Sequence, residues 1–206
     1  IVAGDFNRLT LGLPRKDLVA ATLEDYDVSV ITNSGNFNFS TASQSNTCDI
    51  WAFTDMVSGQ FKTSSSNWDI AGVGYDNQCF LYVLHGSKTG TFNFNCATDR
   101  YPMEIGCLGG GGQRTPVFHA IGQGNLNGGT KNDLVVTFPS RPGRLLWMLG
   151  KGDGTFQFNP SNPSYRASIS GEMPLQVICA DLDQDGFDDI IIGADSANSS
   201  AGESYV

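Results

Sequence analysis

Four aspartates near the carboxy end of the chain have the spacing of a calcium-binding loop. Carboxylates stand at positions 1, 3, 5 and 9 of the run from Asp181 to Asp189, and Gly186 stands at position 6. Ca2+ takes six to eight oxygen ligands, which alternate residues of a tight loop can supply, and glycine permits the sharp turn between them. A solvated acidic turn is the alternative, but without a cation its carboxylates would repel one another. We therefore predict a Ca2+ site formed by four carboxylates and one main-chain carbonyl: Asp181, Asp183, Asp185, Phe187 and Asp189.

The positions around this loop predict an all-β fold made of repeats. An aspartate followed by an apolar run occurs at Asp17, Asp69, Asp133 and Asp189, at intervals of about 50–65 residues. An alternating strand that ends in a glycine turn and an aromatic residue also recurs, as in Gly-Thr-Phe at 154–156. Each unit thus has room for about four short strands, and a helical period is nearly absent. Such units are typical of β-propeller blades.

The repeats divide the chain into three whole units and a partial fourth. Their approximate bounds are 1–50, 51–108, 113–172 and 173–206. We expect residues 1–206 to form a single β-propeller domain or a fragment of one. Three arrangements stay open at this point: a piece of a larger propeller, a closed ring of four small blades, or an assembly with other copies of the chain.

The segment 181–194 and the later run Gly202-Glu-Ser-Tyr-Val206 resemble the FG-GAP repeat of integrin-type β-propellers. Gly-Asp-Phe-Asn at 4–7 and Gly-Asp-Gly-Thr-Phe at 152–156 resemble the related VCBS repeat. The resemblance implies four-stranded blades with a calcium loop between the first two strands of a blade. It also implies an extracellular protein that serves in adhesion, in carbohydrate binding or as an accessory domain of a larger enzyme.

The other units depart from this calcium pattern. The second unit has Gln60 and Lys62 where ligands would stand, so we expect no cation there. The third unit keeps the spacing with two neutral amides and one carboxylate, which predicts a weak second site at Asn125, Asn127 and Asp133.

Composition and net charge limit the kinds of binding partner and the cellular compartment that we expect for this protein. The net charge of −9 argues against a nucleic-acid partner, and no apolar run is long enough to span a membrane. Five cysteines form no Cys-x-x-Cys pair; Cys96 with Cys107 and Cys48 with Cys79 are possible bridges, whereas Cys179 lies in an apolar strand. Sequons at Asn38 and Asn198 predict glycosylation and agree with secretion.

Catalytic motifs are not apparent in this sequence, and we assign no catalytic or organic-cofactor residues. His85 and His119 lie in or beside predicted strands, where a lone histidine is usually structural. We therefore expect a secreted, extracellular, calcium-binding and non-catalytic propeller. Its expected roles are adhesion, matrix or filament assembly, or recognition of a glycan or an extracellular protein, with other copies of itself as a possible partner. The alternative is the propeller part of a polysaccharide-degrading lyase or hydrolase.

Overall fold

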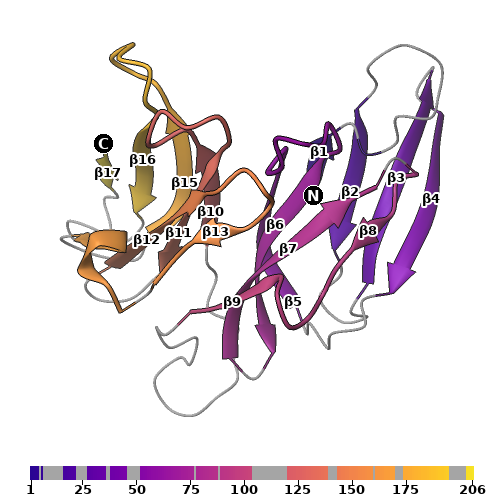
Figure 1. The fold of residues 1–206 in the computed structure, drawn as a ribbon, viewed down its shortest axis with the longest axis horizontal. Coiled ribbons are helices and arrows are strands. Elements are labelled where there is room, and N and C mark those ends of the chain that lie inside the picture. Colours follow the sequence, from indigo (N-terminus) through magenta and orange to yellow (C-terminus); the bar gives the residue numbers. More distant parts are fainter. Residues whose placement is uncertain are drawn as a thin grey trace.

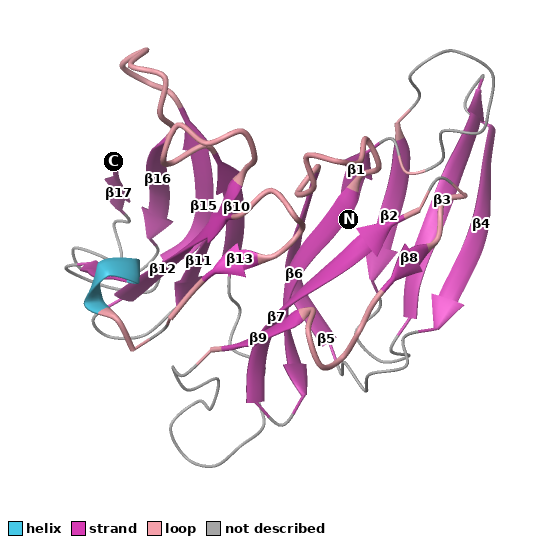
Figure 2. Ribbon diagram, in the orientation of Figure 1, coloured by secondary structure: helices cyan, strands magenta, loops and turns pink. Residues whose placement is uncertain are grey.

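The computed structural model describes most of the chain as β-strands and connecting turns. The described residues are 1–4, 6, 16–21, 27–35, 38–45, 52–76, 78–87, 89–103, 120–138, 143–159, 161–169, 174–194 and 203–206. These residues form four antiparallel sheets, so the predicted all-β fold is confirmed (Figures 1 and 2). The described helical structure is one 3-10 turn, η1 (Pro163–Tyr165).

The strands follow the chain in order within each sheet. The first sheet contains β1 (Val2–Gly4), β2 (Asp17–Ala21), β3 (Asp27–Gly35) and β4 (Asn38–Ser45). The second contains β5 (Ala52–Gly59), β6 (Asp69–Asp76), β7 (Gln78–Gly86), β8 (Phe92–Asn93) and β9 (Arg100–Pro102). The third contains β10 (Ala120–Gly124), β11 (Asp133–Phe138), β12 (Gly143–Gly150), β13 (Phe156–Gln157) and β14 (Arg166–Ile169). The fourth contains β15 (Pro174–Ala180), β16 (Asp189–Ala194) and β17 (Glu203–Tyr205).

The outer strand of the second and third sheets is broken into two pieces. β8 and β9 both pair with β7, at different places along it, and β13 and β14 pair with β12 in the same way. Each of these sheets is thus a four-stranded unit with an interrupted outer strand. Three whole units and a three-stranded fourth agree with the predicted blade count and with a β-propeller.

Hydrophobic cores lie between neighbouring sheets. One cluster joins the first and second sheets, a second joins the second and third, and a third joins the third and fourth. β11 illustrates how one strand can contribute to two of these clusters, because all six of its residues are buried. Successive side chains of a strand point to opposite faces, so Leu134 and Val136 pack toward the second sheet while Val135 packs toward the fourth. An inner sheet is therefore apolar on both faces.

The sheets stand side by side in an open row (Figure 1). The first sheet, in indigo, lies at one end and the fourth, in yellow, lies at the other. Contacts run through the first strand of each sheet, since β1 meets β5, β5 meets β10 and β10 meets β15. This open row does not match the closed four-bladed ring that the sequence left as one alternative.

Three of the five cysteines fall among the described residues. Cys79 and Cys96 are disulfide-bonded, whereas Cys179 is a free thiol whose pKa burial raises to about 12. Cys48 and Cys107 lie outside the described residues, so the predicted pairings stay predictions. Among the described residues, there is no helix with the length and apolar character needed to cross a membrane.

Candidate metal centre

The predicted calcium loop connects β15 to β16. Ala180 pairs with Asp189 in the antiparallel register, so residues 181–188 leave and re-enter the sheet at one place. Asp181, Asp183 and Asp185 each offer a carboxylate oxygen, and these oxygens all lie within 4.8 Å of one another. All three side chains are exposed. The structure thus brings together three of the five residues predicted to hold the ion.

Hydrogen bonds within the loop make these carboxylates converge. The amide of Asp185 donates to Asp181 Oδ1 at 3.1 Å and to Asp183 Oδ1 at 3.2 Å. The amide of Gly186 donates to Asp181 Oδ2 at 3.1 Å. Gly186 has a φ of 94°, which is the left-handed conformation that the sequence argument required of this glycine. The loop therefore curls around its own carboxylates.

The converging side chains fit a hard divalent cation. Three negatively charged groups stand close together, and no lysine or arginine forms an ion pair with any of them among the described residues. Carboxylate oxygens are the ligands that Ca2+ prefers, and a cation would remove the repulsion between them. Asp181, Asp183 and Asp185 would hold such an ion.

Asp189 lies at the base of the loop rather than within the converging group. Its Oδ2 accepts a hydrogen bond from the amide of Leu182 at 3.1 Å, which ties the two ends of the loop together. Phe187, the remaining predicted ligand, has a side chain that is partly exposed and lies beside Gly128 of the third sheet. Its predicted contribution is a main-chain carbonyl, and that role stays a prediction.

The position of Asp189 belongs to a pattern shared by all four sheets. Asp17, Asp69, Asp133 and Asp189 each begin the second strand of a sheet, and we call them the clamp aspartates. In every sheet, Oδ2 of the clamp aspartate accepts from a main-chain amide of the preceding loop, at 2.9–3.1 Å. In the first three sheets, Oδ1 also accepts from an amide at the third strand, at 2.8–2.9 Å.

Comparison with known families places the metal loop within a defined segment. Residues 125–192 match the family model of the FG-GAP-like repeat. This segment is similar to the FG-GAP-like repeat, and we call residues 125–192 the matched segment. The match covers about a third of the chain and runs from the loop after β10 to β16, so it includes the residues Asp181–Asp189. No curated protein matches the chain.

The matched segment, residues 125–192, also contains the predicted second site. Both oxygens of Asp133 accept main-chain hydrogen bonds, from Leu126 and Gly150, and Asn127 Oδ1 accepts from Gly129. Burial raises the pKa of Asp133, although these hydrogen bonds oppose the shift. Asn125 differs, because its Oδ1 is buried and has no hydrogen-bond partner. Asp133 and Asn127, two of the three residues predicted to bind the ion, thus already accept hydrogen bonds from main-chain amides.

The loop after β10 and the loop after β15, both in the matched segment, are linked across the third and fourth sheets. Asp188 exchanges two hydrogen bonds with Asn125: its amide donates to the Asn125 carbonyl at 2.8 Å, and its Oδ2 accepts from the Asn125 amide at 2.7 Å. Asp188 stands between Asp185 and Asp189, so the predicted metal loop is hydrogen-bonded to the neighbouring sheet.

Several predicted positions lie outside the matched segment. Asn38 begins β4, but its side chain is outside the described part of the structure, as are Asn198 and His119. His85 is 13% exposed, with Nδ1 3.7 Å from Asp69 Oδ1 and Nε2 3.8 Å from Asp99 Oδ1. Asp69 is itself a clamp aspartate bonded to the amide of Gly86, so His85 sits in a structural setting.

Sequence reasoning noticed the clamp aspartates as a repeat but missed their role. Asp133 and Asp189 are predicted as metal ligands because they occupy position 9 of a calcium-type loop, and that role stays a prediction beside their main-chain contacts. One signal could have separated the two roles. Asp69 is retained in the second unit, where Gln60 and Lys62 replace the ligands, so the aspartate must do something that needs no ion.

Proposed function

We propose that this protein is an extracellular, calcium-binding and non-catalytic propeller domain. Its role is adhesion, matrix or filament assembly, or recognition of a glycan or an extracellular protein. The observation that carries the proposal is the convergence of Asp181, Asp183 and Asp185 in the loop of an FG-GAP-like repeat. Calcium is structural in this account, because the three carboxylates lie on a loop between paired strands.

Two further observations support an extracellular setting. Cys79 and Cys96 are disulfide-bonded, and disulfides persist mainly in oxidising compartments outside the cytosol. The metal carboxylates are exposed, which is typical of a site with modest affinity. Extracellular calcium modules work with dissociation constants of about 10⁻⁴–10⁻³ M, and extracellular calcium is abundant enough to fill them.

Thermal and urea unfolding of Asp183→Ala in calcium and in chelator tests the metal role. A ligand that binds only the folded state stabilises it by mass action, so 10 mM calcium should add about 1.4–2.7 kcal/mol to the wild type at such affinities. The variant should lose most of this gain and should match the wild type in chelator.

The matched control is Asp153→Asn, which removes one exposed carboxylate outside the metal loop. Its unfolding should respond to calcium as the wild type does. Equal destabilisation of Asp183→Ala in calcium and in chelator would refute the metal role.

A binding role and a catalytic role are separated by a second pair of measurements. A glycan array reports retention without turnover, and a reducing-sugar assay on polysaccharide substrates reports bond cleavage. Binding with no sugar release agrees with the proposal. Release of reducing ends that persists after repurification would replace the binding role with a hydrolase or lyase activity.

A further inference from the structure

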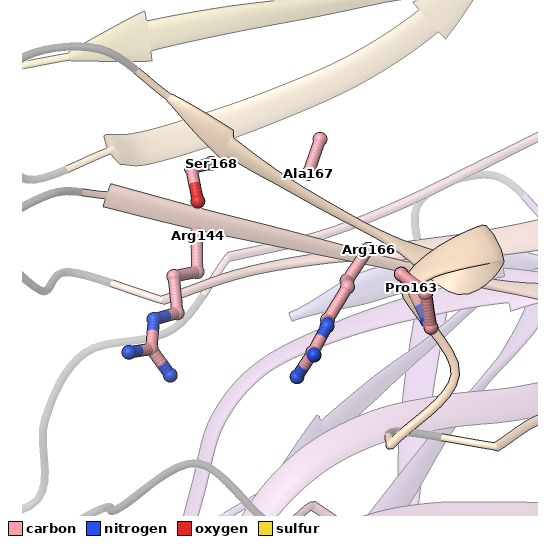
Figure 3. A pocket seen from close by; sticks show the side chains of 5 residues that line it. All are labelled: Arg144, Pro163, Arg166, Ala167 and Ser168. Carbon is pink, nitrogen blue, oxygen red and sulfur yellow. The ribbon is translucent and has the colours of Figure 1, made fainter.

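Two arginines lie along one groove on the third sheet. The groove has a volume of about 410 Å³, and its described lining is Arg144 from β12, Pro163 from η1, and Arg166, Ala167 and Ser168 from β14. Figure 3 shows the side chains of Arg144 and Arg166 extending in the same general direction from their two strands.

Strand register explains why these side chains line the same groove. β12 and β14 are antiparallel, with Arg144 opposite Ser168 and Leu146 opposite Arg166. Residues two apart in a strand share a face, so both arginines and Ser168 lie on one face of the pair. Diagonal neighbours across two strands are within reach of long side chains. The antiparallel pairing of β12 with β14 therefore fixes the relative positions of the main chain at Arg144, Arg166 and Ser168.

The charge of the groove is opposite to that of the molecule. The chain carries a net charge of −9, yet no described carboxylate lines this groove, and neither arginine forms an ion pair with a described residue. Arg100 behaves differently, because its guanidinium lies 4.6 Å from the centre of the Phe80 ring. Guanidinium groups stay charged at any ordinary pH, so two of them side by side repel each other until an anion lies between them.

We propose that this groove binds an oxyanion, a carboxylate or sulfate group carried by an acidic ligand such as a charged saccharide. The guanidinium groups of Arg144 and Arg166 donate paired hydrogen bonds to the anionic oxygens. The hydroxyl of Ser168, directly opposite Arg144, donates a third. Binding here involves none of the metal-loop residues, so it is independent of the calcium site.

Titration of the whole chain with small anions tests the groove. The probes are sodium sulfate and sodium galacturonate, with galactose as the neutral sugar, at constant ionic strength and in the presence of calcium. Binding is followed by calorimetry and by chemical-shift changes of the β12 and β14 amides. The double variant R144Q/R166Q should weaken binding at least about tenfold, since each charge-assisted hydrogen bond contributes strongly to affinity. Ser168→Ala should weaken it less.

The matched control is K16Q/K151Q, which removes the same charge from two exposed lysines outside the groove. It should bind as the wild type does, and unfolding midpoints should show that all the variants fold. Preference for sulfate identifies a sulfate ester as the source of the anion, and preference for galacturonate identifies a uronate. The proposal is overturned if neither anion binds at tens of millimolar, or if R144Q/R166Q binds as tightly as K16Q/K151Q.

Discussion

At the scale of single residues, the clamp aspartates and the metal carboxylates have separate tasks. Asp17, Asp69 and Asp133 are buried and hold main-chain amides, whereas Asp181, Asp183 and Asp185 are exposed and face one another. A buried carboxylate that accepts two amide hydrogen bonds fixes the loop to the third strand of its sheet. Within the part of the chain that the structure describes, the exposed cluster holds no main chain to the third strand, and its proposed task is to bind a cation.

The substitution Asp69→Ala tests the main-chain role of a clamp aspartate apart from the proposed metal role. The substitution leaves the amides of Phe61 and Gly86 without their acceptor, so we expect a loss of about 2–4 kcal/mol in unfolding free energy. Urea unfolding should give the same loss in calcium and in chelator, because no cation is expected in this loop. A loss that vanishes in chelator would mean that Asp69 acts through a metal instead.

Sequence predicted the convergence of three loop aspartates, but it did not predict the main-chain contacts of the clamp aspartates. Alternate aspartates around a glycine carry their chemistry in their spacing, and Asp181, Asp183 and Asp185 converge as expected. Position and charge predict Asp133 as a ligand of a weak site, whereas its main-chain hydrogen-bond partners cannot be read from the sequence. Its second acceptor contact, to Gly150, depends on where the third strand of the sheet ends.

At the scale of elements, the short turn between β12 and β13 of the third sheet is hydrogen-bonded to the second sheet. The turn at Lys151–Thr155 lies against the loop after β5, where Thr63 donates to the Gly152 carbonyl at 2.7 Å and Gly154 donates to the Phe61 carbonyl at 3.2 Å. Asp153 shapes the turn, since its Oδ1 accepts from the Thr155 hydroxyl and amide. These bonds make the turn a connection between sheets as well as a hairpin.

Asp153→Ala should make the protein less stable at neutral pH by about 0.5–1 kcal/mol, because an exposed turn loses two hydrogen bonds. The Thr155 bonds hold the pKa of Asp153 below its ordinary value of 3.8. A lowered carboxyl pKa stabilises the fold above the ordinary value, and this contribution is lost as the pH falls through the folded value.

Urea unfolding at neutral pH and below pH 3 checks the sign of this effect. The difference between wild type and variant should shrink in acid, where the carboxyl of Asp153 becomes protonated. A difference that grows as the pH falls would contradict the role of the ionised carboxylate.

Strands were predictable where apolar runs are long and uninterrupted. Leu134–Val136 and Ile190–Ile192 form β11 and β16 as expected, each starting at its aspartate. The broken outer strands were not foreseen, because β9 and β14 have only three and four residues and neither contains an apolar run. The register that places Arg144 opposite Ser168 depends on these pairings, so the anion groove had no signature in the sequence.

At the scale of the whole molecule, neighbouring sheets share their cores. The second sheet contributes Leu81 and Val83 to the cluster with the third sheet, and Phe80 and Leu84 to the cluster with the first. Removing apolar volume from one cluster therefore weakens two sheets at once. Unfolding of the described sheets should be cooperative for this reason.

Leu134→Ala tests this cooperativity. Leu134 is fully buried between the second and third sheets, and a cavity there should cost about 2–5 kcal/mol. Hydrogen exchange should show lost protection in β6 and β7 as well as in β11 and β12. The control is Leu175→Ala, whose side chain is 37% exposed and should matter little. Loss confined to the third sheet would show that the sheets unfold independently.

The division between clamp and ligand has a consequence for how such a protein can change over time. Asp69 still accepts the amides of Phe61 and Gly86 although its loop carries Gln60 and Lys62, so the proposed ion-binding positions can differ between sheets while these main-chain contacts remain. Substitution of the loop aspartates would remove the proposed ion binding from one blade, and introduction of a few aspartates would add it to another. Neither change would affect the main-chain contacts of the clamp aspartate, on which folding of the blade depends. An engineer can exploit the same freedom by transplanting the aspartate triplet while leaving Asp69 untouched.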